Sequence, residues 1–135
     1  EFSPIFFGVD GMDGILSVKN FDTSLAEGVM LLTPFAADAE DAKDFTSKYE
    51  AAYGEIPNQF AADSYDAVYA VAEAAKTAGI TPDMDASAIC DAMVPAMTQI
   101  TIDGLTGTGT TWNEAGEPNK DPKAVKIVGG KYEMQ

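Results

Sequence analysis

Two short, unbroken apolar runs occur near the start of the chain, at residues 4–9 and 28–33. Continuous apolar runs of this length are typical of strands that are buried on both faces. Gly8 and Pro34 punctuate the runs, and a loop at residues 10–14 leads into a short helical stretch. The pattern therefore predicts two buried strands with a short helix between them.

Apolar residues at spacings of three and four then predict helices. Phe45 and Tyr49 belong to the apolar face of one helix, which Asp38 is expected to cap and which should end near Gly54. A shorter helix is predicted over residues 85–93. The acidic residues on these helices are assigned to solvated faces.

The most strongly helical stretch covers residues 60–78, and Gly79 provides its C-terminal stop. Its expected buried stripe consists of Ala61, Tyr65, Val68, Ala72 and Ala75.

After Thr98 the sequence becomes rich in Thr, Gly, Asn and Pro. Residues 124–128 and 131–134 then predict a β-hairpin joined by Gly129 and Gly130. Strands alternating with helices are typical of a parallel sheet flanked by helices. The predicted fold class is thus α/β, with a parallel sheet, flanking helices and a C-terminal β-hairpin.

Charge and composition narrow the functions that the chain can perform. Its 135 residues amount to one ordinary domain, with 8 basic and 22 acidic residues and a formal net charge of −14. All the basic residues are Lys, and the sequence has neither His nor Arg. This composition excludes a Ser-His-Asp or Cys-His catalytic set, a His-ligated metal site and Arg clamps on phosphate. Nucleic acid is a poor partner for so acidic a chain.

Cys90 is the only cysteine, so no internal disulfide can form. No apolar run reaches the length of a membrane-spanning helix, and no basic-then-apolar signal segment is present. The sequence begins with Glu rather than Met, so we expect it to be processed or cut from a longer protein.

Asp10 is the first candidate for a binding residue, because it follows the first predicted strand at its carboxyl end. Ligands bind at this edge of open α/β sheets, and a carboxylate there can pair with a ligand ammonium group. The alternative is that Asp10 only forms an Asx turn. A calcium site with Asp13 is disfavoured, because the loop lacks the acid spacing of an EF-hand.

Phe35 and Tyr65 are two further candidates. Phe35 follows the second predicted strand and either walls an apolar pocket or fills the core. Tyr65 lies on the long predicted helix, where a tyrosine is usually a core residue with its hydroxyl at the edge. A role facing a ligand is the alternative for Tyr65.

Several blocks, taken in order, resemble one family, the type I periplasmic binding proteins. The similarity is to the branched-chain amino-acid (Leu/Ile/Val) substrate-binding proteins of ABC transporters. No single block is diagnostic, whereas the ordered series is specific and spans nearly the whole chain. The blocks lie at residues 8–13, 26–29, 33–35, 60–69, 103–107, 112–118 and 125–132.

This resemblance implies a Rossmann-like lobe and covers only the C-terminal portion of such a protein. Proteins of this kind have two α/β lobes that close on an amino acid. By analogy, residues 1–57 belong to the second lobe, residues 58–112 return to the first lobe, and residues 113–135 cross back and form the final hairpin.

The resemblance also implies binding residues. The acid of the Gly-x-Asp/Glu-Gly block binds the ligand's α-ammonium group and maps to Asp10, with Met12 in the same block. The tyrosine of the helical block lies at the cleft and maps to Tyr65, and Phe35 is included as a pocket residue. No catalytic residue, metal or cofactor is implied.

The implied function is the uptake of a small amino acid by an ABC permease, through hinge closure and without chemistry. A ligand-sensing ectodomain of a signalling receptor is the alternative, and an enzyme using Asp10 and Asp13 as acid and base is disfavoured because no nucleophile–base pair exists. The full-length protein would carry a signal peptide and be periplasmic or extracellular, lipid-anchored in a Gram-positive source. The isolated chain would either collapse into one reorganised α/β domain or associate with a second copy, and we expect association, as a homodimer or a strand-exchanged pair.

Overall fold

The computed structural model describes residues 3–135 of the chain. It divides into two compact units. The first unit contains residues 1–62 and 121–135, and the second contains residues 63–120.

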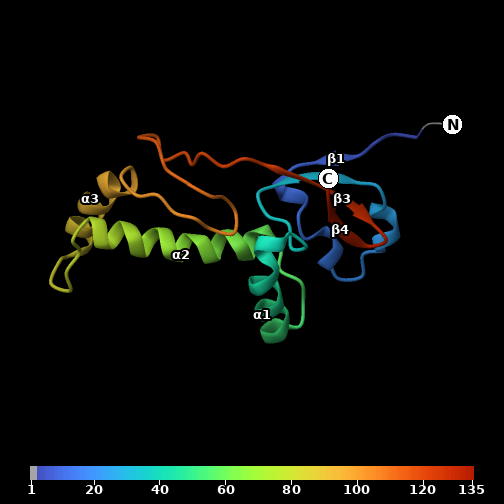
Figure 1. Cartoon of the computed structure of the whole chain (residues 1–135), viewed down its shortest axis with the longest axis horizontal. Helices are drawn as coiled ribbons and strands as arrows, with labels where there is room; N and C mark the ends of the chain where they lie inside the picture. The colour runs from blue at the N-terminus through green and yellow to red at the C-terminus, as the bar shows by residue number, and fades with distance from the viewer. Residues whose placement is uncertain (1–2) are drawn as a thin grey trace. The chain divides into compact units, whose positions relative to one another are not determined.

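The first unit is built on a four-stranded sheet in the order β1-β2-β3-β4 (Figure 1). Its strands are β1 (Phe7–Gly8), β2 (Met30–Thr33), β3 (Lys123–Val128) and β4 (Lys131–Met134). β1 and β2 are parallel, whereas β2 pairs with β3, and β3 with β4, in antiparallel fashion. The α/β class and the C-terminal hairpin are confirmed, and the sheet is mixed because the hairpin returns antiparallel to β2.

The hairpin turn follows from its two glycines. Val128 pairs with Lys131, so the loop has only two residues, and Gly129 and Gly130 have φ values of 56° and 74°. Two consecutive positive φ angles match the right-handed twist of the flanking strands, and glycine adopts them without steric cost.

The core of the first unit lies where β2 meets β3. Leu31 and Ile127 are fully buried, and Val125 is 1% exposed. Leu31 and Val125 are register partners, which places their side chains side by side in the core. The remaining buried members of this cluster are Ala26, Val29 and Ala36.

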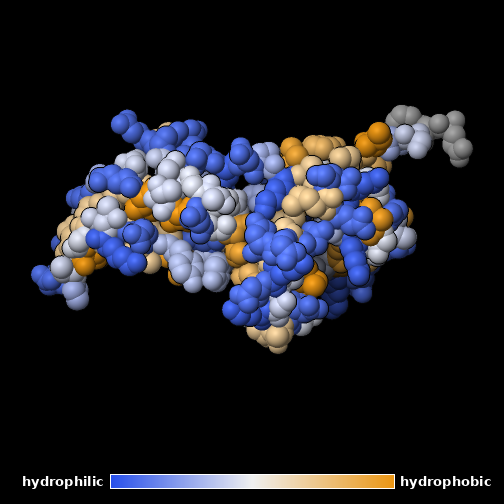
Figure 2. All heavy atoms as spheres, in the orientation of Figure 1, coloured by the Kyte–Doolittle hydropathy of each residue, from blue (hydrophilic) through white to orange (hydrophobic). Residues whose placement is uncertain are grey.

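The first predicted strand is not buried, which corrects the expectation from its continuous apolar run. Ile5 is 83% exposed and Phe6 is 63% exposed. Only Gly8 is buried in β1. Figure 2 shows hydrophobic surface around this N-terminal segment. The run is apolar as a buried strand should be, but β1 is an edge strand, which pairs only with β2 among the described residues.

Short helical elements link the strands of the first unit. They are the 3₁₀ turns η1 (Asp10–Met12), η2 (Ile15–Ser17), η3 (Thr23–Ala26) and η4 (Glu40–Ala42), followed by helix α1 (Lys43–Tyr53). The prediction that Asp38 caps this helix is wrong. The N-cap residue of η4 is Ala39, and the Asp38 carboxylate accepts a hydrogen bond from the Met134 amide at 3.4 Å. Gly54 ends α1 in the left-handed conformation, as predicted.

Helix α2 (Gln59–Thr77) begins in the first unit and continues into the second. Helix α3 (Ala86–Met97) follows it and starts where the sequence predicted, because the Asp85 side chain accepts from the Ala88 amide at 2.9 Å. α3 is longer than expected and includes Pro95 near its end.

The buried face of α2 differs from the predicted stripe. In the second unit it runs through Asp66, Ala70 and Ala74, which are at most 5% exposed, whereas Val68 is 67% exposed. Ala70 and Ala74 pack against Ala96 and Ile100 in one cluster. Small alanine side chains allow this close approach, and the buried residues recur at the four-residue spacing of one helix face. Within residues 3–135, no helix has the length and apolar character needed to span a membrane.

Replacement of Gly8 by alanine tests the close packing beneath β1. A Cβ atom at Gly8 would lie 2.8 Å from the Leu31 side chain and closer still to the Met12 sulfur. We expect Gly8→Ala to lower the free energy of unfolding by about 1–3 kcal/mol, the usual cost of overpacking. Urea unfolding measures the change.

The matched control is Gly11→Ala, because a Cβ at Gly11 meets nothing within 4 Å. Gly11→Ala should raise the free energy of unfolding by at most about 1 kcal/mol, because alanine reduces the conformational entropy of the unfolded chain. Equal stability of the two variants would contradict the packing argument.

Candidate ligand-binding site

Asp10 and Met12 lie together in the 3₁₀ turn η1 that follows β1. The turn is closed by the Asp13 amide, which donates to the Asp10 carbonyl oxygen at 2.9 Å. η1 packs beside β2, and the Asp10 side chain is exposed. The carboxylate of Asp10 is thus open to a partner at the end of a strand.

Met12 is partly buried and packs against the core cluster of the first unit. Its side chain lies over Gly8, in the space that a Cβ would otherwise fill. The glycine in β1 therefore fixes where the turn carrying Asp10 sits on the strand.

Phe35 follows β2 and is only 3% exposed. Its ring meets that of Phe45 on α1 edge-to-face, with ring centroids 6.0 Å apart and an interplanar angle of 88°. This arrangement is favourable for aromatic pairs. Phe35 thus fills the space between the end of β2 and α1.

Asp13 connects the η1 loop to the first residue of α2. One carboxylate oxygen accepts from the Gln59 amide at 2.8 Å, and the other accepts from the Gly14 amide at 2.8 Å. Burial raises the pKa of Asp13 above its usual value, while these amide donors act in the opposite direction. Beside it, burial and the Asp13 charge raise the pKa of the Tyr132 hydroxyl, which accepts from the Gly14 amide.

Tyr65 lies in the second unit and lines a pocket of about 390 Å³. Its ring packs against that of Tyr69 one helical turn later, tilted by 49° with ring centroids 5.0 Å apart and hydroxyl oxygens separated by 3.2 Å. The two rings are 44% and 56% exposed, so both offer aromatic surface to a partner. The other lining residues are Asp66, Ile102, Asp103, Gly104 and Leu105.

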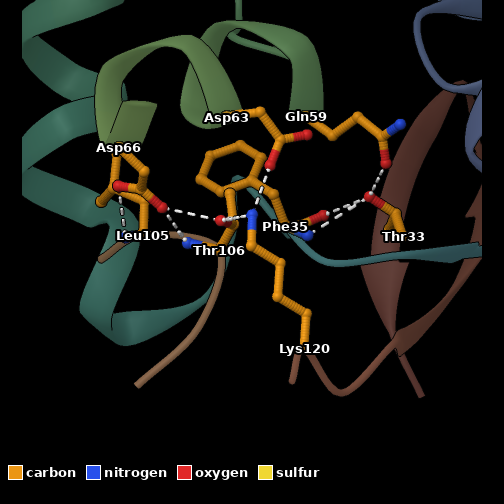
Figure 3. Close-up of polar contacts among 8 residues, drawn as sticks. All are labelled: Thr33, Phe35, Gln59, Asp63, Asp66, Leu105, Thr106 and Lys120. Carbon is orange, nitrogen blue, oxygen red and sulfur yellow. Dashed lines mark hydrogen bonds and ion pairs between the residues drawn. The ribbon is translucent and has the colours of Figure 1, made fainter. Parts of the chain in front are cut away.

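The back of this pocket is organised by Asp66, which the sequence did not single out. Its carboxylate accepts from the amides of Leu105 and Thr106 at 2.9 and 2.8 Å, and from the Thr106 hydroxyl at 2.7 Å (Figure 3). A Cβ at Gly104 would lie 2.5 Å from this carboxylate, so the segment can approach it only with glycine there. The assignment of all helix acids to solvated faces is wrong for Asp66, which is 5% exposed.

Lys120 extends the same polar cluster. Its Nζ donates to the Asp63 carboxylate at 2.8 Å and to the Thr106 hydroxyl at 2.6 Å (Figure 3). A sequence signal for this cluster existed in part: Asp66 interrupts a row of alanines spaced four residues apart, and the opposing segment is rich in Gly and Thr.

The described residues offer groups that can contact a ligand in each unit. Within residues 3–135, no group of three or more His, Cys, Asp or Glu side chains could hold a metal ion. What the first unit offers is an exposed carboxylate at a strand end, and what the second offers is a pocket faced by two tyrosines.

The chain belongs to the periplasmic binding protein family, whose match covers residues 10–131. The family consists of solute-binding proteins of ABC transporters. The resemblance inferred from the ordered sequence blocks is therefore confirmed.

Solved structures agree with this assignment. The substrate-binding protein LivJ of Streptococcus pneumoniae, in complex with isoleucine, is 26% identical with a TM-score of 0.75, over 97% of this chain and 36% of that chain. The leucine-binding protein LivK of Thermotoga maritima is 23% identical with a TM-score of 0.72, over 99% of this chain and 37% of that chain. A solute-binding protein of R. palustris, in complex with benzoate, is 19% identical with a TM-score of 0.74, over 96% of this chain and 34% of that chain.

The chain thus spans little more than a third of the length of these proteins. No curated protein sequence matches it significantly. Because the ligands of the solved relatives include both isoleucine and benzoate, the family alone leaves the solute of this chain undetermined.

The role of Asp66 is tested by Asp66→Asn. Asparagine has the same shape, but an NH2 group replaces one carboxylate oxygen, so a donor faces the donors at Leu105 or Thr106. We expect the free energy of unfolding to fall by about 1.5–3 kcal/mol, as for other hydrogen bonds to charged groups. Trp112 packs on the cluster of the second unit and is the only tryptophan, so its fluorescence during urea unfolding reports this unit.

Asp91→Asn is the control, since Asp91 is an exposed acid in the same unit and the substitution removes the same charge. It should change the unfolding free energy by no more than about 0.5 kcal/mol. A similarly small change in Asp66→Asn would show that the carboxylate does not organise the segment at Leu105.

Proposed function

We propose that this chain is part of the extracellular solute-binding component of an ABC uptake transporter, and that its solute is a branched-chain or related amino acid. The observation that carries the proposal is the exposed carboxylate of Asp10 at the end of β1, in a chain whose family match covers residues 10–131. The isoleucine complex of LivJ, at 26% identity, supports an amino acid as the solute.

In this proposal Asp10 binds the ammonium group of the amino acid. A carboxylate–ammonium pair is a charge-assisted hydrogen bond, which is about twice as strong as a neutral one. Met12 provides apolar surface in the same turn, and Tyr65 provides aromatic surface in the second unit. Phe35, which is buried against Phe45, supports the end of β2 from the interior.

Binding proceeds by closure of two lobes and without a chemical step. We propose that residues 1–57 and 113–135 belong to one lobe and residues 58–112 to the other. The division into two compact units supports two lobes, but the units change at residues 62/63 and 120/121, so residues 58–62 lie with the first unit and residues 113–120 with the second. The complete protein delivers its solute to an ABC permease from the periplasmic or extracellular side of the membrane.

The proposal is tested with the full-length protein and three probes: L-isoleucine, L-leucine and benzoate. An amino-acid probe present at a hundred times its dissociation constant should add roughly 2.7 kcal/mol of apparent stability, measured by thermal shift. Stabilisation by benzoate alone would contradict an amino-acid solute, and stabilisation by none of the three would contradict the proposed class of solute.

Asp10→Asn separates an ammonium-binding role from a turn-forming one. Loss of the charge that pairs with the ligand ammonium should weaken binding of the effective amino acid by about 2–5 kcal/mol, measured by calorimetry. Asp121→Asn removes an exposed acid of the same unit and should leave the affinity unchanged. Unchanged affinity in Asp10→Asn would return Asp10 to a role in the turn only.

We also propose that the isolated chain pairs with a second copy through β1. This strand has β2 on one side only among the described residues. Its own Phe7 and the preceding Ile5 and Phe6 are more than half exposed. Unpaired strand edges and exposed apolar side chains both favour association. The net charge of −14 opposes it, but physiological salt screens charges beyond about 8 Å.

Light scattering at physiological salt should therefore give twice the mass of one chain. Phe7→Lys, which places a charge on the strand edge, should restore the monomer. Leu25→Lys is the control, since Leu25 is 75% exposed on η3, away from the edge. A monomer at all concentrations would contradict the pairing.

A further inference from the structure

Besides the Asp66 cluster of the second unit, a set of buried polar groups lies in the first unit, between the end of β2 and the loop that follows β1. Thr33, the last residue of β2, is 2% exposed, and Gln59, the first residue of α2, is 2% exposed. Neither residue is part of the apolar core cluster of this unit. Burial of such groups is costly unless each is hydrogen-bonded, so their contacts identify what they hold in place.

The Thr33 hydroxyl is the centre of these contacts. Its oxygen lies 2.8 Å from the side-chain oxygen of Gln59 and accepts from the Phe35 amide at 3.2 Å (Figure 3). The Phe35 carbonyl oxygen is a second, longer acceptor at 3.1 Å. Because a hydroxyl has one proton, the shorter contact indicates donation to Gln59.

Gln59 continues the chain towards η1. Its backbone amide donates to the Asp13 carboxylate at 2.8 Å, and Asp13 directly follows the turn that carries Asp10 and Met12. The resulting path runs Phe35–Thr33–Gln59–Asp13 and joins three segments that are far apart in the sequence. Burial of Asp13 strengthens its hydrogen bond to the helix start, because the surroundings screen the charge less than water does.

We propose that Thr33 and Gln59 are positioning residues of the ligand site: their hydrogen bonds hold the loop bearing Asp10 in register with the strand end bearing Phe35. This inference rests on the proposed function, since it concerns the same site. The two residues touch no ligand themselves. They hold the loop that carries the exposed Asp10 against a buried strand end, and a binding site needs such support in order to be preorganised.

The test compares Thr33→Val with Thr33→Ser in the full-length protein, with L-isoleucine and L-leucine as probes. Valine keeps the shape of threonine but removes the hydroxyl, whereas serine keeps the hydroxyl. We expect Thr33→Val to weaken binding of the effective probe by about 10–100-fold, the range seen when supporting hydrogen bonds of a site are removed. Thr33→Ser should retain an affinity within about threefold of the parent protein.

Thr46→Val is the matched control, because it makes the same substitution in the same unit. The Thr46 hydroxyl donates to the Ala37 carbonyl oxygen at 3.1 Å and lies outside the proposed path. All affinities are measured by calorimetry well below the melting temperature, so that partial unfolding does not enter. Hydrogen exchange of the Phe35 amide, which should accelerate in Thr33→Val alone, reports that the path is broken.

The outcomes separate this inference from the proposed function. If the parent protein binds neither probe, the proposed function fails and the inference fails with it. If the parent binds but Thr33→Val binds equally well, or if Thr46→Val loses as much affinity, the positioning role is wrong while the function stands. If Thr33→Val does not fold, Gln59→Met removes the acceptor at similar length and is held to the same expectation.

Discussion

The first unit depends on the antiparallel pairing of β2 with β3. This pairing joins residues 30–33 to residues 123–126, which lie at least ninety positions apart in the sequence. It brings Leu31 against Val125 and, with Ile127, forms the part of the core that is most completely removed from water. Since β2 also carries β1 on its other edge, the turn with Asp10 and the strand end with Phe35 both take their positions from this one strand.

Buried polar groups, rather than additional apolar bulk, fix the segments around the candidate site. Thr33 and Gln59 do so in the first unit, and Asp66 does so in the second. Such groups must find hydrogen-bond partners, because leaving a buried acceptor unpaired costs more stability than a hydrogen bond contributes. This requirement also restricts the backbone. Leu105 and Thr106 donate to Asp66 in an arrangement that brings residue 104 close to the carboxylate, which a glycine permits.

Each of the two units presents exposed groups of a kind that can contact a small molecule. Asp10 presents an exposed carboxylate in the first unit, and Tyr65 and Tyr69 present a pair of partly exposed rings in the second. Membership in a family of ABC transporter solute-binding proteins agrees with this chemistry. The two tyrosines lie one turn apart on the same helix, so the helical repeat alone places both at one pocket.

The sequence by itself determined the local structure and the family. Gly54, Asp85 and the Gly129-Gly130 pair marked a helix end, a helix start and a hairpin turn, because caps and tight turns depend on a few adjacent residues. The exposure of β1, the burial of Asp66 and the contact of Thr33 with Gln59 were decided only by the tertiary structure. Each of these features depends on contacts with segments tens of residues away. The local pattern of polar and apolar positions does not indicate which distant segment will pack on a strand or donate hydrogen bonds to a carboxylate.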